Sequence, residues 1–598
     1  MKEETPNKII QFIGILFFGF LFYLSIVFYK ERMLSFDPAY FSFQILDFRR
    51  FFIALGRWGS IFSEIIPFIA FKTHCSLPTF LKIYSASFIL NYYLIFLFIT
   101  VILKNYRAGI VFMLSLCLGF RLVFYYPTQE LYIGIALSVL LWAIIAPQNP
   151  YLSKLKRQLA TITSLPLIFT ISYCHQLAFF TIMFALAFEL IYQKRWKDIH
   201  IWIPIAFTFI WFFIRIEFLT TSEYEQEKLI TFNLLTDGMR HFFHLSGWTY
   251  FHNFFLHSLK TLCAVIFLVM LIMVLLKRWL LLSFSMLFML GFLVLIVIIY
   301  AGGSNPLFYE NYYPPFGFFA AVMLMYLIFE RFPQSLTITI ISVLLLLNLK
   351  GIYNAHALQT ERVNYLDRLT AYGRKLPQKK YLLNLKNIPI DVVTIQGFIP
   401  FETMLYSSLQ NPDSAVTFYW ANDINQYDSL LNRENGFLGP DFCVTWFTTN
   451  NMNRKYYHLP KTNYMKVNTP QTAPDFQESI FNNKNVTLQA LKSEIHSSTY
   501  NFVVAPIKIT NTSGKTIYST PDGPHPIFIT YHIYDTSGRI LYWNNARSIL
   551  EVDINTEYTQ GLMVYLPPKK GTYIIEADIV TEGLRFWNIN SRFKLVYD

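Results

Sequence analysis

The sequence has few charged side chains for its length. Of its 598 residues, 14% are charged and 54% are hydrophobic, whereas an average soluble domain carries about 25% charged residues. A water-soluble globule of this size would need more polar surface, so the composition excludes a wholly soluble protein. Five cysteines without a paired spacing exclude a disulfide scaffold. An aromatic content of 18% excludes a disordered chain.

Long apolar runs take the place of charge, and they fall in residues 1–355. A membrane-spanning helix needs about 20 mostly apolar residues. The first run, 9–28, is followed by charged residues and no cleavage site, which predicts a retained helix rather than a signal peptide. Eleven spans are predicted, at roughly 9–28, 79–103, 108–124, 130–146, 158–173, 175–191, 199–219, 260–276, 279–300, 314–329 and 334–349.

Basic residues are concentrated in alternate loops between these spans. Loops near residues 104–107, 154–157, 194–197, 277–278 and 331 carry Lys or Arg, and the intervening loops are nearly free of them. Because cytoplasmic loops are enriched in Lys and Arg, we expect a bacterial inner-membrane protein with a cytoplasmic N-terminus and a periplasmic C-terminal region. A miscounted span would reverse the location of that region. The same bias explains the net charge of +12, so no nucleic-acid partner is predicted.

The first outer loop, 29–78, is not a polar linker. Apolar residues recur at helical spacing through 43–55 and 61–71, which predicts two amphipathic helices in the membrane interface. Asp37 precedes Pro38, and a residue before proline is usually held extended. We therefore expect the Asp37 carboxylate to lie outside a helix.

Ionisable and polar side chains accumulate at the outer ends of the predicted spans. Such groups at a membrane boundary are candidates for function, although any one of them can be an ordinary interfacial residue. The candidates are Asp37, Asp47, Arg57, Glu64, Arg121, Glu130, His175, Gln176, Arg215, Glu310 and Tyr312.

The outer loop 220–259 carries four histidines. His241 and His244 are three residues apart, a spacing that can hold zinc on a helix. No cysteine or carboxylate lies at a matching spacing, so the favoured interpretation is aromatic interface residues with polar tips. No metal site is predicted.

The C-terminal third has the composition of a soluble protein. The predicted domains are a membrane domain over 1–355, a mixed α/β region over 356–480 and a β-sandwich over 481–598. Seven β-rich runs separated by turn signals in about 114 residues indicate an immunoglobulin-like sandwich. These runs are 486–491, 500–510, 526–535, 539–545, 561–567, 571–580 and 592–598. The segments KITNTSGKTI, YHIYDTSGRILYWNN and LPPKKGTYIIEADIVTEGLRFW resemble the Ig-like modules of bacterial cell-envelope sugar enzymes.

Many spans, an acidic first outer loop with two interfacial helices, and an outer C-terminal domain together resemble the GT-C glycosyltransferases. The resemblance implies a polyprenyl-phosphate-linked sugar donor, a glycan or lipid-linked acceptor, and action at the outer membrane leaflet. It further implies that Asp37, or Asp47 as second choice, is the general base or a ligand of a divalent metal, and that Glu130 is the second acidic residue. The chain lacks the Asp-Glu or Glu-x-Asp pair of several branches of that family.

Transfer of a sugar from a lipid phosphate requires the same kinds of residue. A base must deprotonate the acceptor hydroxyl, and positive charge must stabilise the departing phosphate. Arg57, Arg121 and Arg215 are the predicted phosphate-binding residues, and Glu64, His175, Gln176, Glu310 and Tyr312 the predicted substrate contacts. Two alternatives stay open: a non-catalytic scaffold of an envelope complex, and a transporter, flippase or polymerase of glycans or lipids.

Overall fold

The computed structural model describes most of the chain. The described residues are 4–128, 130–145, 154–219, 232–301, 310–329, 331–384, 398–421, 431–439, 446–450, 452–467, 485–497, 502–519, 526–543, 545–581 and 585–598. They form two compact units. Unit 1 comprises 1–229, 259–294 and 310–357, and unit 2 comprises 230–258, 295–309 and 358–598. Two segments from the predicted membrane domain thus belong to the same unit as the C-terminal region.

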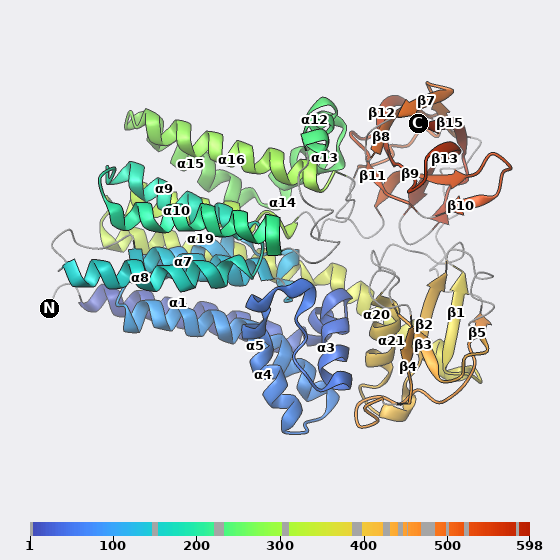
Figure 1. Ribbon diagram of the computed structural model, residues 1–598, viewed down its shortest axis with the longest axis horizontal. Coiled ribbons are helices and arrows are strands. Elements are labelled where there is room, and N and C mark those ends of the chain that lie inside the picture. The colour runs from blue at the N-terminus through green and yellow to red at the C-terminus, as the bar shows by residue number, and fades with distance from the viewer. Residues whose placement is uncertain are drawn as a thin grey trace. The chain divides into compact units, whose positions relative to one another are not determined.

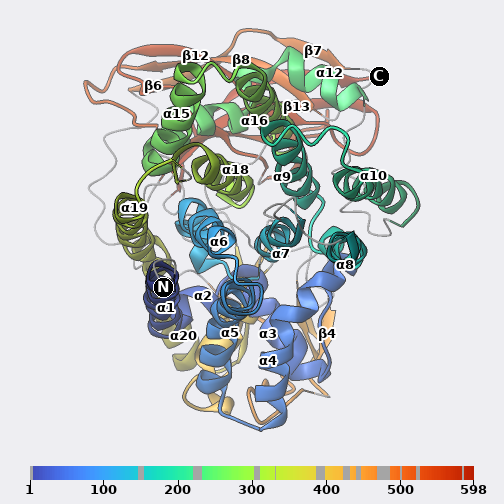
Figure 2. The same cartoon turned by 90° about the vertical axis from the view of Figure 1, so that its left-hand side faces the viewer.

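Unit 1 is helical, and its long helices run side by side (Figure 1; end-on in Figure 2). The first predicted span and the first long loop contain α1 (Glu4–Val27), α2 (Tyr29–Met33), α3 (Phe36–Phe48), η1 (Ala54–Gly56), η2 (Trp58–Ser60) and α4 (Ile61–Lys72). The following ones are α5 (Leu77–Leu97), η3 (Phe98–Ile102), α6 (Tyr106–Gly119), η4 (Leu122–Tyr125), α7 (Glu130–Ile145), α8 (Lys154–Ser172), α9 (Ala178–Tyr192), α10 (Ile199–Ile214) and η5 (Arg215–Leu219). The last are α15 (Lys260–Leu275), α16 (Trp279–Ile299), α18 (Pro314–Leu324), η8 (Met325–Phe329) and α19 (Gln334–Asn354).

The prediction of eleven spans is too high, as the lengths and compositions of the helices show. Each predicted span falls on a helix, but only five described helices are long and apolar enough to cross a membrane. These are Lys8–Val27, Leu77–Ile102, Ile199–Leu219, Trp279–Ile299 and Gln334–Lys375. A sixth span results if the bent pair Ser246–Ser258 and Lys260–Leu275 counts as one. The remaining apolar helices are short: at about 1.5 Å per residue, the 14 residues of α6 fall well below a hydrocarbon core of about 30 Å.

Those shorter helices form the interior of unit 1. α6 is buried at every position from Ala108 to Gly119, and α18 is buried along its whole length. The two helices pack closely because both carry glycine at the contact. A Cβ atom added at Gly317 would lie 2.9 Å from the carbonyl oxygen of Ser115. Small residues at a helix contact are a common means of packing apolar helices in membranes.

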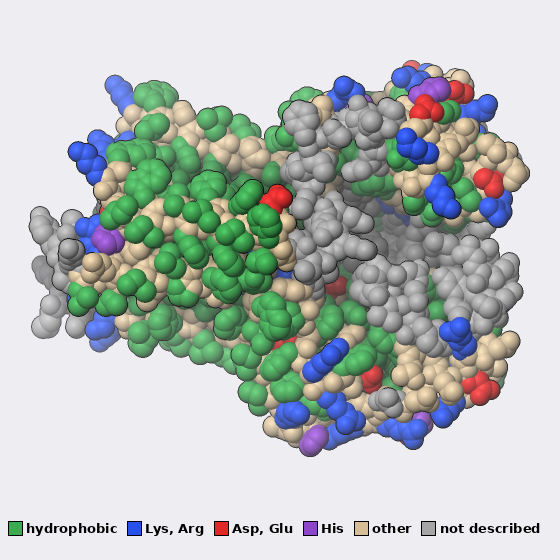
Figure 3. All heavy atoms as spheres, viewed as in Figure 1, with side chains coloured by type: hydrophobic (Ala, Val, Ile, Leu, Met, Phe, Trp, Pro, Cys, Tyr) green, Lys and Arg blue, Asp and Glu red, His purple; other side chains and the backbone are tan. Residues whose placement is uncertain are grey.

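The outward side chains of unit 1 are mainly hydrophobic, as Figure 3 shows in green. Phe213, Leu271 and Leu287 are 61%, 42% and 71% exposed. Exposed apolar faces of this extent, on long apolar helices, identify a membrane-associated protein. Lys and Arg gather at one end of the helices, at the left of Figure 3.

The middle part of unit 2 is a small α/β arrangement. A parallel sheet of order β2-β1-β5 is built from β1 (Lys380–Asn384), β2 (Thr417–Ala421) and β5 (Met465–Val467). The accompanying elements are α20 (His356–Lys375), α21 (Ile399–Ser407), η11 (Pro412–Ser414), β3 (Gly436–Leu438) and β4 (Trp446–Thr448). A buried ion pair of Arg362 with Glu402 joins the two helices. The sequence predicts a mixed α/β region over 356–480 but no strand order within it.

The C-terminal part of unit 2 is β-rich, as predicted. Its strands are β6 (Val486–Ala490), β7 (Glu494–Ser497), β8 (Phe502–Asn511), β9 (Ile527–Tyr534), β10 (Ile540–Tyr542), β11 (Ser548–Ile549), β12 (Glu557–Tyr565), β13 (Gly571–Thr581), β14 (Arg585–Phe586) and β15 (Ser591–Tyr597). One sheet has the order β10-β9-β13-β15-β7, with β11 on β9 and β14 on β13, and the other the order β12-β8-β6. Residues of both sheets form one apolar core that includes Ile509, Ile533 and Phe593. All seven predicted runs therefore contain a strand. The division at residues 355 and 480 stays a prediction.

Candidate functional site

Asp37 lies in the first turn of α3. The Tyr126 hydroxyl donates a hydrogen bond to its carboxylate. The prediction that Asp37 lies outside a helix is wrong, since Asp37 and Pro38 are both in this turn. Proline is tolerated there because the backbone N–H groups of a first helical turn have no partner within the helix. Burial raises the pKa of Asp37 to about 6, the Tyr126 hydrogen bond and Arg57 lower it, and Glu130 raises it. Asp37 is therefore an ionised carboxylate at neutral pH that accepts a proton just below it.

Arg57 and Glu130 form an ion pair beside Asp37, with 3.2 Å between Nη1 and Oε2. Their side chains are 13% and 10% exposed. Two glycines let the first loop reach this position. Gly56 has a φ of 68°, which favours glycine. Gly59 approaches Cys174 so closely that a Cβ atom would lie 2.3 Å from its sulfur.

Glu64 lies in the first turn of α4 and is 1% exposed. Its Oε2 accepts a hydrogen bond from the backbone N–H of Phe52 at 2.7 Å, whereas Oε1 has no hydrogen-bond partner among the residues that the structure describes. Burial raises the pKa of Glu64 to about 8, the Phe52 N–H lowers it, and Glu130 raises it. Glu64 is thus a neutral carboxylic acid at neutral pH, with one oxygen available to a ligand.

His175 and Gln176 form the turn between α8 and α9. The backbone N–H of Leu177 donates to His175 Nδ1 at 3.1 Å, and the imidazole ring centre lies 6.4 Å from that of Tyr312. Burial lowers the pKa of His175 well below its ordinary value, and so do Arg57 and Arg215. A neutral imidazole with Nδ1 as acceptor carries its proton on Nε2, so this ring offers a hydrogen-bond donor to a ligand.

Arg121 and Glu310 pair with each other. The guanidinium contacts Oε1 through Nε at 2.8 Å and through Nη2 at 2.5 Å. The backbone N–H of Leu122 donates to Oε2 at 3.1 Å. One predicted phosphate-binding residue and one predicted substrate contact thus pair with each other, and they join the loop after α6 to the segment before α18.

Arg215 lies near His175, whereas Asp47 lies away from Asp37. Arg215 is buried, donates to the carbonyl oxygen of Ser172, and lies over the Tyr173 ring at 5.2 Å. Asp47 lies near the end of α3, ten residues after Asp37, which places the two carboxylates about 15 Å apart along the helix axis. Asp47 and Asp37 are therefore at opposite ends of α3.

Five buried polar atoms around these residues make no hydrogen bond within the described part of the chain. They belong to the side chains of these ionisable residues or of their close neighbours. They are Glu64 Oε1, Tyr84 Oη, Thr128 Oγ1, Gln176 Nε2 and Asn311 Oδ1. Because an unsatisfied buried polar group costs about 1–3 kcal/mol, several of them near these residues indicate that water or a polar ligand completes their hydrogen bonds.

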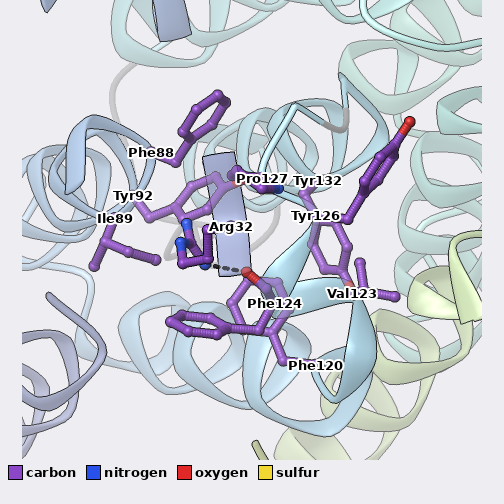
Figure 4. A pocket seen from close by; sticks show the side chains of 10 residues that line it. All are labelled: Arg32, Phe88, Ile89, Tyr92, Phe120, Val123, Phe124, Tyr126, Pro127 and Tyr132. Carbon is purple, nitrogen blue, oxygen red and sulfur yellow. Dashed lines mark hydrogen bonds between the residues drawn. The ribbon is translucent and has the colours of Figure 1, made fainter. Parts of the chain in front are cut away.

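The sequence analysis missed two residues of the site, Tyr126 and Arg32. Arg32 is 1% exposed, donates to Ser85 Oγ at 2.8 Å and to the Phe124 carbonyl, and lines an aromatic cavity with Tyr92, Tyr126 and others (Figure 4). In sequence it belongs to a Lys-Glu-Arg group after the first span, which is typical of an ordinary interface. No signal distinguished it. Its bond to Phe124 holds the chain two residues before Tyr126.

Among the described residues, no group of three His, Cys, Asp or Glu side chains is arranged to hold a metal ion. No protein-family model, curated protein or solved structure matches this chain.

Proposed function

We propose that the protein is a membrane glycosyltransferase that moves a sugar from a polyprenyl-phosphate donor to a glycan or lipid-linked acceptor. One observation carries the proposal: the Tyr126-bound Asp37 lies with the Arg57–Glu130 ion pair at one end of apolar helices. The GT-C-like arrangement of the sequence points to the same chemistry. A soluble donor is disfavoured, because the sequence has no Gly-rich phosphate-binding loop between its spans.

Asp37 is the proposed general base. The acceptor's hydroxyl proton passes to this carboxylate while the acceptor oxygen forms a bond to the anomeric carbon. The bond from that carbon to the phosphate oxygen breaks, and its electron pair stays on the lipid phosphate. A base with a pKa of about 6 is suited to this step near neutral pH.

Arg57 is the proposed partner of the departing phosphate. Its guanidinium lowers the pKa of both Asp37 and His175, so it lies within electrostatic range of the base and of the imidazole. Glu130 contacts it at 3.2 Å, and a guanidinium is the side-chain group best suited to bind phosphate oxygens. The neutral Glu64 and His175 are suited to sugar hydroxyls, because each presents a hydrogen-bonding atom at the same site.

We further propose that the Asp37 end of the helices faces the periplasm of a bacterial inner membrane. The Lys- and Arg-rich loops support this orientation, because they gather at one end of the helices in Figure 3. The N-terminus is then cytoplasmic and the C-terminal region periplasmic.

An immunoglobulin-like fold is proposed for the C-terminal β-rich part. The sheets β12-β8-β6 and β10-β9-β13-β15-β7 follow the order expected for strands A, B and E opposite strands C, F and G. β7, which follows the first strand β6, pairs in parallel with the last strand β15. This pairing is consistent with a first strand that is divided between the two sheets.

A transfer assay with purified variants tests the proposed reaction. Asp37→Asn should retain folding and lose transfer from a polyprenyl-phosphate sugar by about 10²–10⁴-fold. Glu189→Gln is the matched control: Glu189 is also a buried carboxylate that accepts from a tyrosine, Tyr326, and pairs with Arg195 at 3.1 Å. It lies near the other end of α9 from His175. Equal activity of both variants would contradict the proposal, and the scaffold alternative would gain if no donor gave transfer.

A further inference from the structure

The segment 232–258, here called the collar, belongs to unit 2 although both chain neighbours are apolar helices of unit 1. Its elements are α12 (Phe232–Arg240), η6 (Phe242–His244), α13 (Ser246–Tyr250), η7 (Phe251–Phe255) and α14 (Leu256–Ser258). One residue, Leu259, separates the end of the collar from the start of α15, so the collar is directly connected to an apolar helix.

Three polar side chains join the collar to the β-rich part. Ser246 Oγ lies 3.4 Å from both the Arg547 carbonyl oxygen and the Ile549 backbone nitrogen. Asn253 Nδ2 donates to the Glu551 carbonyl at 2.8 Å. His244 Nδ1 lies 3.2 Å from the Glu551 carboxylate. These contacts are all within unit 2, so the collar and the β-rich part form one body.

The collar also contacts the last turns of a membrane-spanning helix. α16 is one of the five helices long enough to cross a membrane, and its final residues, from Leu295, belong to unit 2. The backbone N–H of Ser246 donates to the Ala301 carbonyl at 3.2 Å. Gly238 leaves no room for a side chain, since a Cβ atom there would lie 2.7 Å from Ile298. Because the end of a span is at a membrane surface, the collar lies at that surface too.

Four large apolar side chains of the collar are exposed. Leu235, Met239, Phe243 and Leu256 are 37%, 53%, 67% and 46% exposed. Residues 232–260 contain eight aromatic residues, four histidines, Arg240 and Lys260 against one acidic residue. Exposed apolar side chains next to aromatic and basic ones are typical of a helix in the lipid headgroup region.

We infer that the collar lies in the headgroup region of the bilayer and holds the β-rich part against the membrane surface. The partner is lipid: the contact with the end of α16 fixes the depth, and Met239 and Phe243, four residues apart on neighbouring turns, supply the inserted side chains. Glu551 links the collar to the β-rich part, because its carboxylate contacts His244 and its backbone carbonyl accepts a hydrogen bond from Asn253. The inference does not depend on the proposed enzymatic function.

Spin labels on the full-length protein in lipid nanodiscs test the depth of the collar. A nitroxide at Phe243→Cys, in a background without native cysteines, should collide more often with oxygen than with a water-soluble nickel complex. Tyr518→Cys is the matched control, because Tyr518 is an exposed aromatic residue, 58% accessible, in the β-rich part. Equal nickel access at both positions would overturn the inference. Low access to both reagents at residue 243 would also overturn it, since that result indicates a protein partner instead.

A second measurement needs no substitution. A photoreactive lipid that labels from the headgroup region should modify the unaltered protein within 232–258, and mass spectrometry should locate the adducts at Met239 and Phe243. Residues 485–519 should stay unlabelled. Labelling of the outward faces of α1 and α10 without labelling of the collar would contradict the inference.

Discussion

The Arg57 guanidinium pairs with the Glu130 carboxylate across 3.2 Å, and this contact joins the first long loop to the start of α7. The two side chains are largely buried, so each charge depends on the other for compensation. The pair therefore has two roles in our account. It holds the loop in place, and it orients the guanidinium toward the site of the lipid phosphate.

Removal of one member should cost more than removal of both. Glu130→Gln or Arg57→Met leaves a buried charge uncompensated, and we expect each to lower the free energy of unfolding by about 3 kcal/mol. The double variant Arg57→Met/Glu130→Gln should recover much of this loss while staying inactive. A double-mutant cycle of thermal or denaturant unfolding measures the coupling. Additive effects of the two substitutions would show that the ion pair is not a unit.

The rate of transfer should have a bell-shaped dependence on pH. Asp37 must be ionised to act as base, so the rate should rise with pH and level off above about 6. Glu64 loses its proton at about pH 8, which adds a negative charge near Glu130 and repels phosphate, so the rate should fall above that pH. In Glu64→Gln the alkaline decline should disappear and the acidic limb should stay. An unchanged alkaline limb would assign that decline to another group.

Tyr126→Phe should move the acidic limb to higher pH. The Tyr126 hydrogen bond stabilises the charged form of Asp37 and lowers its pKa, so its loss raises the pKa above about 6. The rate at pH 6 should drop several-fold and recover by pH 8. A uniform loss of rate at every pH would indicate that Tyr126 acts on the substrate rather than on Asp37.

Glu64 should make the protein less stable as pH rises. Its pKa is raised from 4.5 to about 8 by folding. Between these values the folded state holds the proton and the unfolded state has released it, so stability falls with pH across this window. Glu64→Gln should remove that fall. The difference in melting temperature between variant and parent should therefore be small at pH 5 and largest above pH 8. A constant difference would mean that Glu64 does not titrate in this window.

The sequence predicted the helices and strands better than their roles. Hydrophobic runs located eleven helices, but a run does not tell whether a helix faces lipid or protein. α6 and α7 are apolar because they are buried in the centre of unit 1. Only the structure shows that these two helices are too short to cross a membrane. Runs rich in β-branched and aromatic residues between turn signals located seven strands, because such residues fill the core that the two sheets share. The parallel sheet was missed, since its strands have three to five residues.

The site was predicted in its acidic residues and missed in its contacts. Asp37, Glu64 and Glu130 could be found from their places at the ends of apolar runs. The choice of Tyr126 as partner depends on how the loop after α6 folds back, and no pattern in the sequence fixes this. Arg121 and Glu310 are 189 residues apart, and nothing in the spacing of such residues predicts that they pair with each other rather than with a ligand.

The position of a bound lipid phosphate tests the central claim most directly. An electron cryomicroscopy map of the protein with a polyprenyl monophosphate should show the phosphate within hydrogen-bonding distance of Arg57, on the side of Asp37 and His175, with the lipid chain leaving along the apolar helices. Arg57→Met should abolish that density and leave the helices unchanged. Phosphate density at another place, or density unaffected by Arg57→Met, would contradict the account.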